Sequence, residues 1–216
     1  MAMVHCNNCT SELNAWAEFV QSALNLFGVK ASTGDVLSAL FNSSVNSQTD
    51  CGGITAIGFI SGEPIVGLPE GRPLLVRSSD GRMTVENLMK AEIYSAVAPL
   101  AIGMNILKSE GVSVNSICGH GGFFKTKEVG QRAVSAALST SVTVLDNAGE
   151  GGAWGIALLA SYVGKHCSLE EFLDGIFADV KSSALTATEE EIKQFDKYFA
   201  RYKRCLAVER NATEVM

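Results

Sequence analysis

Two clusters of glycine in the middle of the chain are the residues with the clearest chemical potential. Each cluster follows a short β-branched run and precedes a stretch that is rich in small residues. Glycine before a helix lets phosphate oxygens approach the unpaired backbone N–H groups and the positive end of the helix dipole. One such cluster is more often only a tight turn, but two in consecutive units favour a nucleotide or another phosphorylated ligand. The clustered glycines are Gly119, Gly121, Gly122, Gly149, Gly151 and Gly152.

Charged residues beside these glycines each have two interpretations. Lys125 could reach a phosphate, although a lysine at the start of a helix is as often simply solvated. Asp146 could contact a ribose, magnesium or nothing at all. Glu150 stands just before a helix N-terminus, which stabilises a carboxylate in any case. The structural interpretation is therefore favoured for Glu150, and both stay open for the other two.

The familiar nucleotide-binding motifs do not fit the first turn. A P-loop needs glycine directly before Lys-Ser or Lys-Thr, but Phe124 precedes Lys125 here. The dinucleotide fingerprint G-x-G-x-x-G also fails, because Phe124 takes the place of its third glycine. The sequence contains no G-x-S-x-G, and neither His5 nor His166 has an evident Ser or Asp partner. The glycine stretch therefore predicts binding and shows no catalytic residue.

The glycine clusters belong to two strand–turn–helix units, which predict a βαβ arrangement with parallel strands. The first unit has a strand from Val114 to Cys118 and a helix to about Leu138. The second has a strand from Val142 to Asp146 and a helix to about Val163. Both turns would then lie at the carboxyl ends of neighbouring strands, where open α/β sheets bind ligands.

The other segments predict further elements around these units. Apolar residues at three- and four-residue steps indicate a helix from about Thr10 to Phe27, and Thr84 is placed to cap a long helix to about Ser109. We expect one compact α/β domain over residues 1–216. The remaining predicted elements are strands at Ala2–Cys6, Ile54–Ile60 and Leu74–Arg77, helices at Asp35–Phe41, Leu169–Phe177 and Thr188–Arg204, and a fraying tail from Ala207.

Composition and charge exclude several classes of partner. The net charge is −6 and there is no lysine- or arginine-rich run, so nucleic acid and anionic membrane are poor partners. No apolar run approaches the roughly 20 residues that span a bilayer, and the N-terminus lacks a signal-peptide pattern. Cys6 and Cys9 form the only C-x-x-C, a redox pair or half a metal site at most. Free thiols in a reducing compartment are favoured, so we expect a cytoplasmic protein.

Both glycine turns are similar to those of a known family. The segments G-H-G-G-F-F-K-T-K-E-V-G-Q-R-A-V-S-A-A-L and V-T-V-L-D-N-A-G-E-G-G-A-W-G-I-A-L-L-A resemble the ATP-binding part of FGGY-family carbohydrate kinases, in the xylulose/ribulose kinase branch. Upstream, V-H-C-N-N-C-T-S-E-L-N-A-W resembles the family's entry into its second domain, and F-I-S-G-E-P resembles one of its turns. The resemblance covers nearly the whole chain.

The resemblance implies an actin-like ATPase (ribonuclease H-like) fold, in which this chain would be the C-terminal half of a two-domain sugar kinase. ATP, together with Mg²⁺, would lie in a cleft between the two domains. By their place in the family's motifs, the nucleotide-binding residues would be Gly119, Gly121, Gly122, Phe123, Lys125, Gln131, Gly149, Glu150, Gly151, Gly152 and Ala153.

The resemblance also implies what this chain does not supply. The family's D-x-G-T phosphate loop, its G-T-S segment and the aspartate that acts as base on the sugar are absent from the sequence. The chain alone would then be inactive, and its abrupt start at Met1 suggests that another segment precedes it. The implied partners are the N-terminal domain and a sugar, xylulose or ribulose, and two copies can pair as a homodimer. The alternatives are a nucleotide-binding sensor or regulator without chemistry, and an α/β domain for another phosphorylated ligand.

Overall fold

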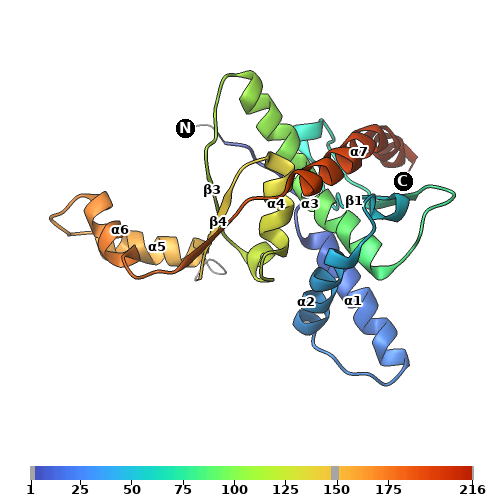
Figure 1. Cartoon of the computed structure of the whole chain (residues 1–216), viewed down its shortest axis with the longest axis horizontal. Coiled ribbons are helices and arrows are strands. Elements are labelled where there is room, and N and C mark those ends of the chain that lie inside the picture. The colour runs from blue at the N-terminus through green and yellow to red at the C-terminus, as the bar shows by residue number, and fades with distance from the viewer. Residues whose placement is uncertain (1–2, 147–150, 216) are drawn as a thin grey trace.

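The computed structural model describes residues 3–146 and 151–215, and one long helix runs through its centre (Figure 1). This helix, α3 (Val85–Ser109), contacts strand β1 (Ile54–Ile57) as well as helix α4 (Val129–Leu138). Helix α3 therefore joins the strand β1 to the helix α4.

The described strands form two small sheets that share no strand. In the first, β1 pairs antiparallel with β2 (Leu74–Arg77). In the second, β3 (Ile117–Gly119) is parallel to β4 (Val142–Leu145), and β5 (Ser182–Leu185) is antiparallel to β4. The parallel pair confirms the predicted βαβ arrangement, and β2 has the predicted bounds.

Helix α3 begins and ends where the sequence predicts. Oγ1 of Thr84 accepts a hydrogen bond from the backbone N–H of Asn87, which satisfies one donor at the helix start. The helix continues through Pro99 and ends at Ser109. Its buried side chains include Tyr94, which is almost fully enclosed. Because so many of its side chains are buried, α3 forms the centre of the hydrophobic core.

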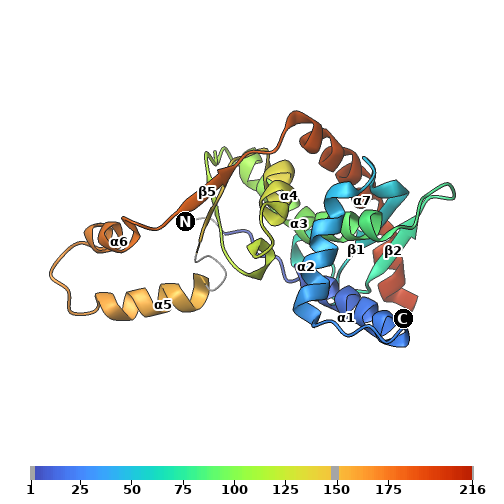
Figure 2. The ribbon, with the colours of Figure 1, turned by 60° about the horizontal axis from the view of Figure 1, so that its bottom comes forward.

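Helices α1 (Ser11–Leu26) and α2 (Thr33–Ser43) pack against each other and against α3. Gly28, with φ of 73°, turns the chain after α1. Oγ of Ser32 accepts a hydrogen bond from the N–H of Asp35, so α2 starts two residues before the predicted helix. The two helices form one layer beside α3 (Figure 2).

The first strand–turn–helix unit differs from its prediction in detail. β3 begins at Ile117 instead of Val114. Ile117 pairs with Val142, the first residue of the partner strand β4. The glycines are followed by a short 3₁₀ helix, η4 (Gly122–Phe124), and α4 begins only at Val129. Glu128 has φ of 64°, which an α-helix cannot accommodate, so the helix cannot start earlier. The first glycine cluster therefore does not stand directly at an α-helix N-terminus.

One strand prediction was wrong, and another was confirmed with a shorter strand. Residues 3–6 form no strand and pair with none of the described strands. β1 ends at Ile57 rather than Ile60, because the N–H of Gly58 donates to Oγ of Ser95 on α3 instead of to a neighbouring strand. The chain leaves the sheet at that point.

The last helix, α7 (Glu189–Val215), is longer than predicted. The segment from Ala207 onward is helical and does not fray. The reason is a contact with the body of the protein: Oε1 of the buried Glu209 accepts a hydrogen bond of 2.6 Å from the N–H of Arg72. A buried anchor near the chain end stabilises turns that would fray in solution.

Helix α7 also completes the core. The hydroxyl of Tyr198 lies 3.0 Å from the carbonyl oxygen of Ala56 in β1 and 2.8 Å from that of Ala91 in α3. Tyr198 is fully buried. One side chain thus ties the last helix to the first sheet and to the central helix.

Helices α5 (Gly151–Tyr162) and α6 (Leu169–Phe177) form a hairpin that projects from the rest of the chain (Figures 1 and 2). The rings of Tyr162 and Phe172 lie 5.4 Å apart between the two helices. The N-terminus of α6 has a capping box, in which Ser168 and Glu171 bond to each other's backbone N–H groups. None of the described helices is long and apolar enough to cross a membrane. The assignment of residues 1–216 to one domain stays a prediction.

Candidate functional site

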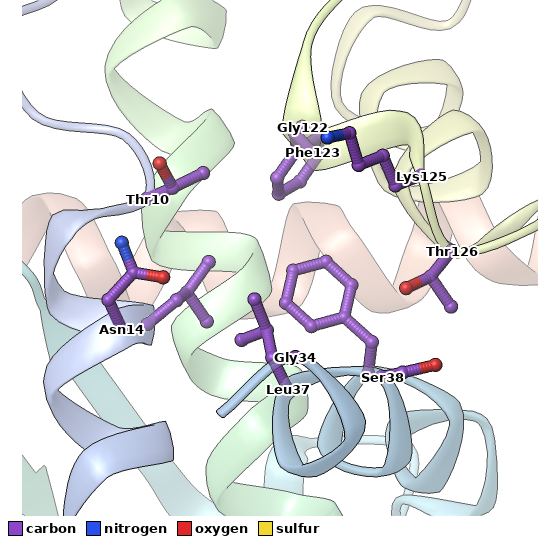
Figure 3. A pocket seen from close by; sticks show the side chains of 11 residues that line it. Thr10, Asn14, Gly34, Leu37, Ser38, Gly122, Phe123, Lys125 and Thr126 are labelled. Carbon is purple, nitrogen blue, oxygen red and sulfur yellow. The ribbon is translucent and has the colours of Figure 1, made fainter. Parts of the chain in front are cut away.

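A cavity of about 390 Å³ lies between the first glycine turn and helices α1 and α2 (Figure 3). From the turn it is lined by Gly122, Phe123, Lys125 and Thr126. Three of these residues, Gly122, Phe123 and Lys125, are among those predicted from the sequence to bind nucleotide. The predicted turn is therefore one wall of a cavity large enough for a small ligand.

Two phenylalanines hold this wall against α2. The rings of Phe41 and Phe123 meet edge to face, with centroids 5.9 Å apart, and both side chains are buried. Phe124 packs against Phe123 in the same manner, 5.6 Å away. Gly119 makes room for this packing, because a Cβ there would come within 2.7 Å of the Phe124 ring. The turn is fixed by aromatic packing behind it.

The glycines at the tip of the turn leave the cavity side open. Gly121 has φ of 100°, which glycine adopts without strain. A Cβ added to Gly122 would meet no atom within 4 Å. Packing therefore does not require glycine at position 122. A side chain at position 122 would instead occupy the space through which a ligand can approach the backbone.

Helices α1 and α2 supply the opposite wall, which the sequence did not predict. Polar groups come from Thr10, just before α1, from Asn14 in α1 and from Ser38 in α2 (Figure 3). Thr10 and Asn14 are four residues apart and hence on one helix face.

Gln131, which the sequence predicts to bind nucleotide, is buried inside the protein. Its Nε2 donates to the carbonyl oxygens of Val142, at 3.1 Å, and Ser183, at 3.0 Å. The side chain is buried and joins α4 to β4 and β5. Because the amide nitrogen is used in the sheet, we leave Gln131 out of the proposed ligand contacts.

The described part of the second glycine turn does not line this cavity. Gly151, Gly152 and Ala153 form the first turn of α5, in the projecting hairpin. Gly152 lines a different cavity, of about 400 Å³, between α5 and α6. Gly149 and Glu150, also predicted to bind nucleotide, lie outside the described residues.

The carboxyl group of Glu92 on α3, which does not line the cavity, has a strongly perturbed pKa. Burial, and then the charge of Glu12, raise the pKa of Glu92 to about 8. The hydrogen bond from Trp16 lowers this pKa, but by less than the other two effects raise it. The residues that shift this pKa, Glu12 and Trp16, lie on α1, where it packs against α3. Among the described residues, no group of three or more His, Cys, Asp or Glu side chains could hold a metal ion.

The sequence matches the C-terminal domain of the FGGY family of carbohydrate kinases over residues 1–163. The chain belongs to the FGGY family. The resemblance of the glycine turns is thereby confirmed, and with it the actin-like fold of an FGGY C-terminal domain. No match was found among curated protein sequences.

Solved structures of FGGY kinases share this fold at low sequence identity. The xylulose kinase from Rhodospirillum rubrum has a TM-score of 0.68 and 14% identity, over 91% of this chain and 37% of that chain. The gluconate kinase from Lactobacillus acidophilus has a TM-score of 0.67 and 16% identity, over 97% and 39%. Plasmodium falciparum glycerol kinase with ADP has a TM-score of 0.60 and 14% identity, over 88% and 37%. The chain thus spans less than two fifths of the length of these kinases.

Proposed function

We propose that the cavity between Gly122 and helices α1 and α2 binds ATP. In this proposal the chain is the nucleotide-binding part of a kinase that transfers the γ-phosphate of ATP to a hydroxyl of a pentulose, xylulose or ribulose. The observation that carries the proposal is the meeting of the predicted glycine turn with a cavity of ligand size. The pentulose rests on the resemblance of both turns to the xylulose/ribulose kinase branch.

The cavity lining suits the parts of a nucleotide. Leu37, Phe41 and Phe123 offer apolar and aromatic surface to a base. Asn14 and Ser38 offer an amide and a hydroxyl that can fix the orientation of a base or ribose. The open backbone at Gly122 offers an approach for phosphate oxygens.

Lys125 completes this proposed phosphate end. Its side chain extends back along the turn towards Gly122 (Figure 3). An ammonium group there would act on the phosphates as a point charge. Mg²⁺ prefers carboxylate and phosphate oxygens, and the described residues that line the cavity include no carboxylate. We therefore place the metal ion on the phosphates and on groups outside this chain, and derive no step through it.

The proposed share of this chain in the reaction is binding and orientation. The base that deprotonates the sugar hydroxyl, and most sugar contacts, would come from the other domain of a two-domain kinase. We accordingly propose that residues 1–216 bind ATP without phosphoryl transfer. All six cysteines are free, which fits the reducing cytoplasm that we propose as the location.

Calorimetric titration with ATP tests this proposal. Gly122→Ala adds a methyl group that no protein atom opposes, so folding should be unaffected while ATP affinity falls by about tenfold or more. Gly175→Ala in α6 is the matched control, because its Cβ also meets nothing within 4 Å and it lies far from the cavity. Unchanged ATP affinity in both Gly122→Ala and Lys125→Ala would refute the proposed site.

The same titration decides the role of the second turn. Gly152→Ala likewise meets no protein atom. Because Gly152 lines another cavity, we expect ATP affinity to be retained in this variant. A loss there would show that the second turn also contacts the nucleotide, as the sequence resemblance implies.

A further inference from the structure

Three buried polar atoms on helix α7 and on the segment between β1 and β2 have no hydrogen-bond partner among the described residues. They are Oε1 of Glu63, the hydroxyl of Tyr202 and Oε2 of Glu209. All three residues are 0% exposed. A buried polar atom without a partner destabilises the folded state, and nearly all such atoms in folded proteins have one. The three atoms therefore indicate a partner that the neighbouring side chains do not provide.

The segment that carries Glu63 packs along α7 and brings these atoms near one another. Before Glu63, the ring of Phe59 meets that of Tyr202 edge to face, with centroids 6.5 Å apart. After it, the N–H of Arg72 donates to Oε1 of Glu209 at 2.6 Å. Burial first, and then the charges of Glu63 and Glu209, raise the pKa of the Tyr202 hydroxyl. Both carboxyl groups consequently lie close to that hydroxyl.

A single water molecule can satisfy all three atoms. Neither carboxyl group accepts a direct hydrogen bond from the Tyr202 hydroxyl. Polar groups that face each other beyond about 3.5 Å are commonly bridged by water. One water can accept a hydrogen bond from Tyr202 and donate its two protons to Oε1 of Glu63 and Oε2 of Glu209. About three hydrogen bonds to otherwise unpartnered groups are usual for a buried water.

The two carboxyl groups do not require a metal ion between them. Oε2 of Glu63 accepts hydrogen bonds from the N–H groups of Asn7, at 2.9 Å, and Asn8, at 3.1 Å, which stabilise its ionised form. Burial raises the pKa of Glu209, and a protonated Glu209 would donate to the same water, which still donates to Glu63. A cation could not accept the hydrogen bond of the Tyr202 hydroxyl. Water is therefore the better ligand for this site.

We propose that Glu63, Tyr202 and Glu209 enclose a binding site for one water molecule, which joins α7 to the segment between β1 and β2. The same carboxyl group also holds the start of α1, because Oε2 of Glu63 accepts a third hydrogen bond from Nδ2 of Asn8 at 3.2 Å. The water thus supports the segment that leads to Thr10 of the candidate cavity. The proposal does not depend on nucleotide binding.

A high-resolution crystal structure of the chain tests the site directly. We expect one water peak within about 2.5–3.0 Å of the three oxygen atoms. Direct hydrogen bonds among the three side chains, or no peak between them, would overturn the proposal. Crystals soaked in rubidium chloride distinguish water from a monovalent cation, because rubidium scatters anomalously. An anomalous peak at this site would show that a cation binds there and would also overturn the proposal.

Urea unfolding of Tyr202→Phe tests the site in solution. The change removes only the hydroxyl, so the loss of its bond to the water should raise the unfolding equilibrium constant by about tenfold. A hydroxyl without a partner would instead leave stability unchanged or increased when removed, and that result would refute the site. Tyr198→Phe is the matched control, since Tyr198 is also 0% exposed on α7 and its hydroxyl donates to carbonyl oxygens of the protein.

Discussion

The indole N–H of Trp16 donates a hydrogen bond of 2.8 Å to Oε1 of Glu92 and thereby joins α1 to the buried side of α3. Glu92 is only 3% exposed. Burial first, and then the charge of Glu12, raise its pKa from 4.5 to about 8, so the carboxyl group is protonated at neutral pH in the folded state.

Protein stability should therefore fall as the pH rises through this interval. Because the folded state holds the Glu92 proton more tightly than the unfolded state, the contribution is complete below pH 4.5 and is lost as the pH rises to about 8. The slope from this group is at most about 1.4 kcal/mol per pH unit. Urea unfolding at pH 5, 6, 7 and 8 measures it. In Glu92→Gln the slope should flatten, and an identical slope in both proteins would contradict the assignment.

Gln131→Ala should reduce stability without affecting nucleotide affinity. The change leaves the carbonyl oxygens of Val142 and Ser183 without the Gln131 donor, which costs about 1–3 kcal/mol. Denaturant unfolding measures this loss, and ATP titration of the folded variant measures affinity. Weakened ATP binding at unchanged stability would instead assign Gln131 to the ligand site.

Arg201→Lys should destabilise the contact between α7 and the first sheet. Its guanidinium donates to Oδ1 of Asp50 at 2.6 Å, to the carbonyl oxygen of Ile54 at 2.7 Å and to Oγ1 of Thr55. An ammonium group cannot reproduce this planar fork, so we expect a loss of about 1–3 kcal/mol in thermal unfolding.

Lys197 provides the control for that measurement. It also pairs with Asp50, at 3.5 Å, but its side chain is 63% exposed. Lys197→Ala should therefore change stability by less than about 1 kcal/mol. Equal losses in the two variants would show that net charge, and not the geometry of the fork, sets the stability of this contact.

Alanine at three neighbouring glycines should have graded effects on folding. At Gly119 the new methyl group would collide with the Phe124 ring, and at Gly121 alanine would be strained by the φ of 100°, so each change should cost about 1–3 kcal/mol. At Gly122 it meets no atom and should cost little. Thermal unfolding of the three variants gives the order, and a large loss at Gly122 would mean that its glycine is structural.

Local signals made part of this fold predictable. Thr84 and Ser168 cap their helices as their positions in the sequence indicate, and Gly28 ends α1. The two β-branched runs before the glycines form the parallel pair β3 and β4. In each case the physical cause lies within a few residues of its effect, so the sequence alone contains it.

Features that depend on distant contacts were not predictable. Strand β5 consists of Ser182–Leu185, which has no β-branched residue and forms a strand only because β4 offers it an edge. The final turns of α7 persist because Glu209 meets Arg72.

Only one of the two walls of the candidate site could be predicted, because the other wall depends on distant contacts. The wall around Gly122 has a local glycine signature, whereas Asn14 and Ser38 reach the cavity through the packing of α1 and α2 on α3. The position of Gly152, outside that cavity, depends on the direction in which α5 leaves the sheet, which no local pattern encodes.

The place of Tyr198 between β1 and α3 sets the order of events during synthesis. Its contacts with Ala56 and Ala91 span more than a hundred positions of the chain, so the first sheet and the central helix emerge from the ribosome well before the helix that completes them. Until then their apolar surfaces are exposed to chaperones and to aggregation. A ribosome that stalls before residue 198 would leave a nascent chain that cannot close its core, even though every residue of the Gly122 cavity has already been made.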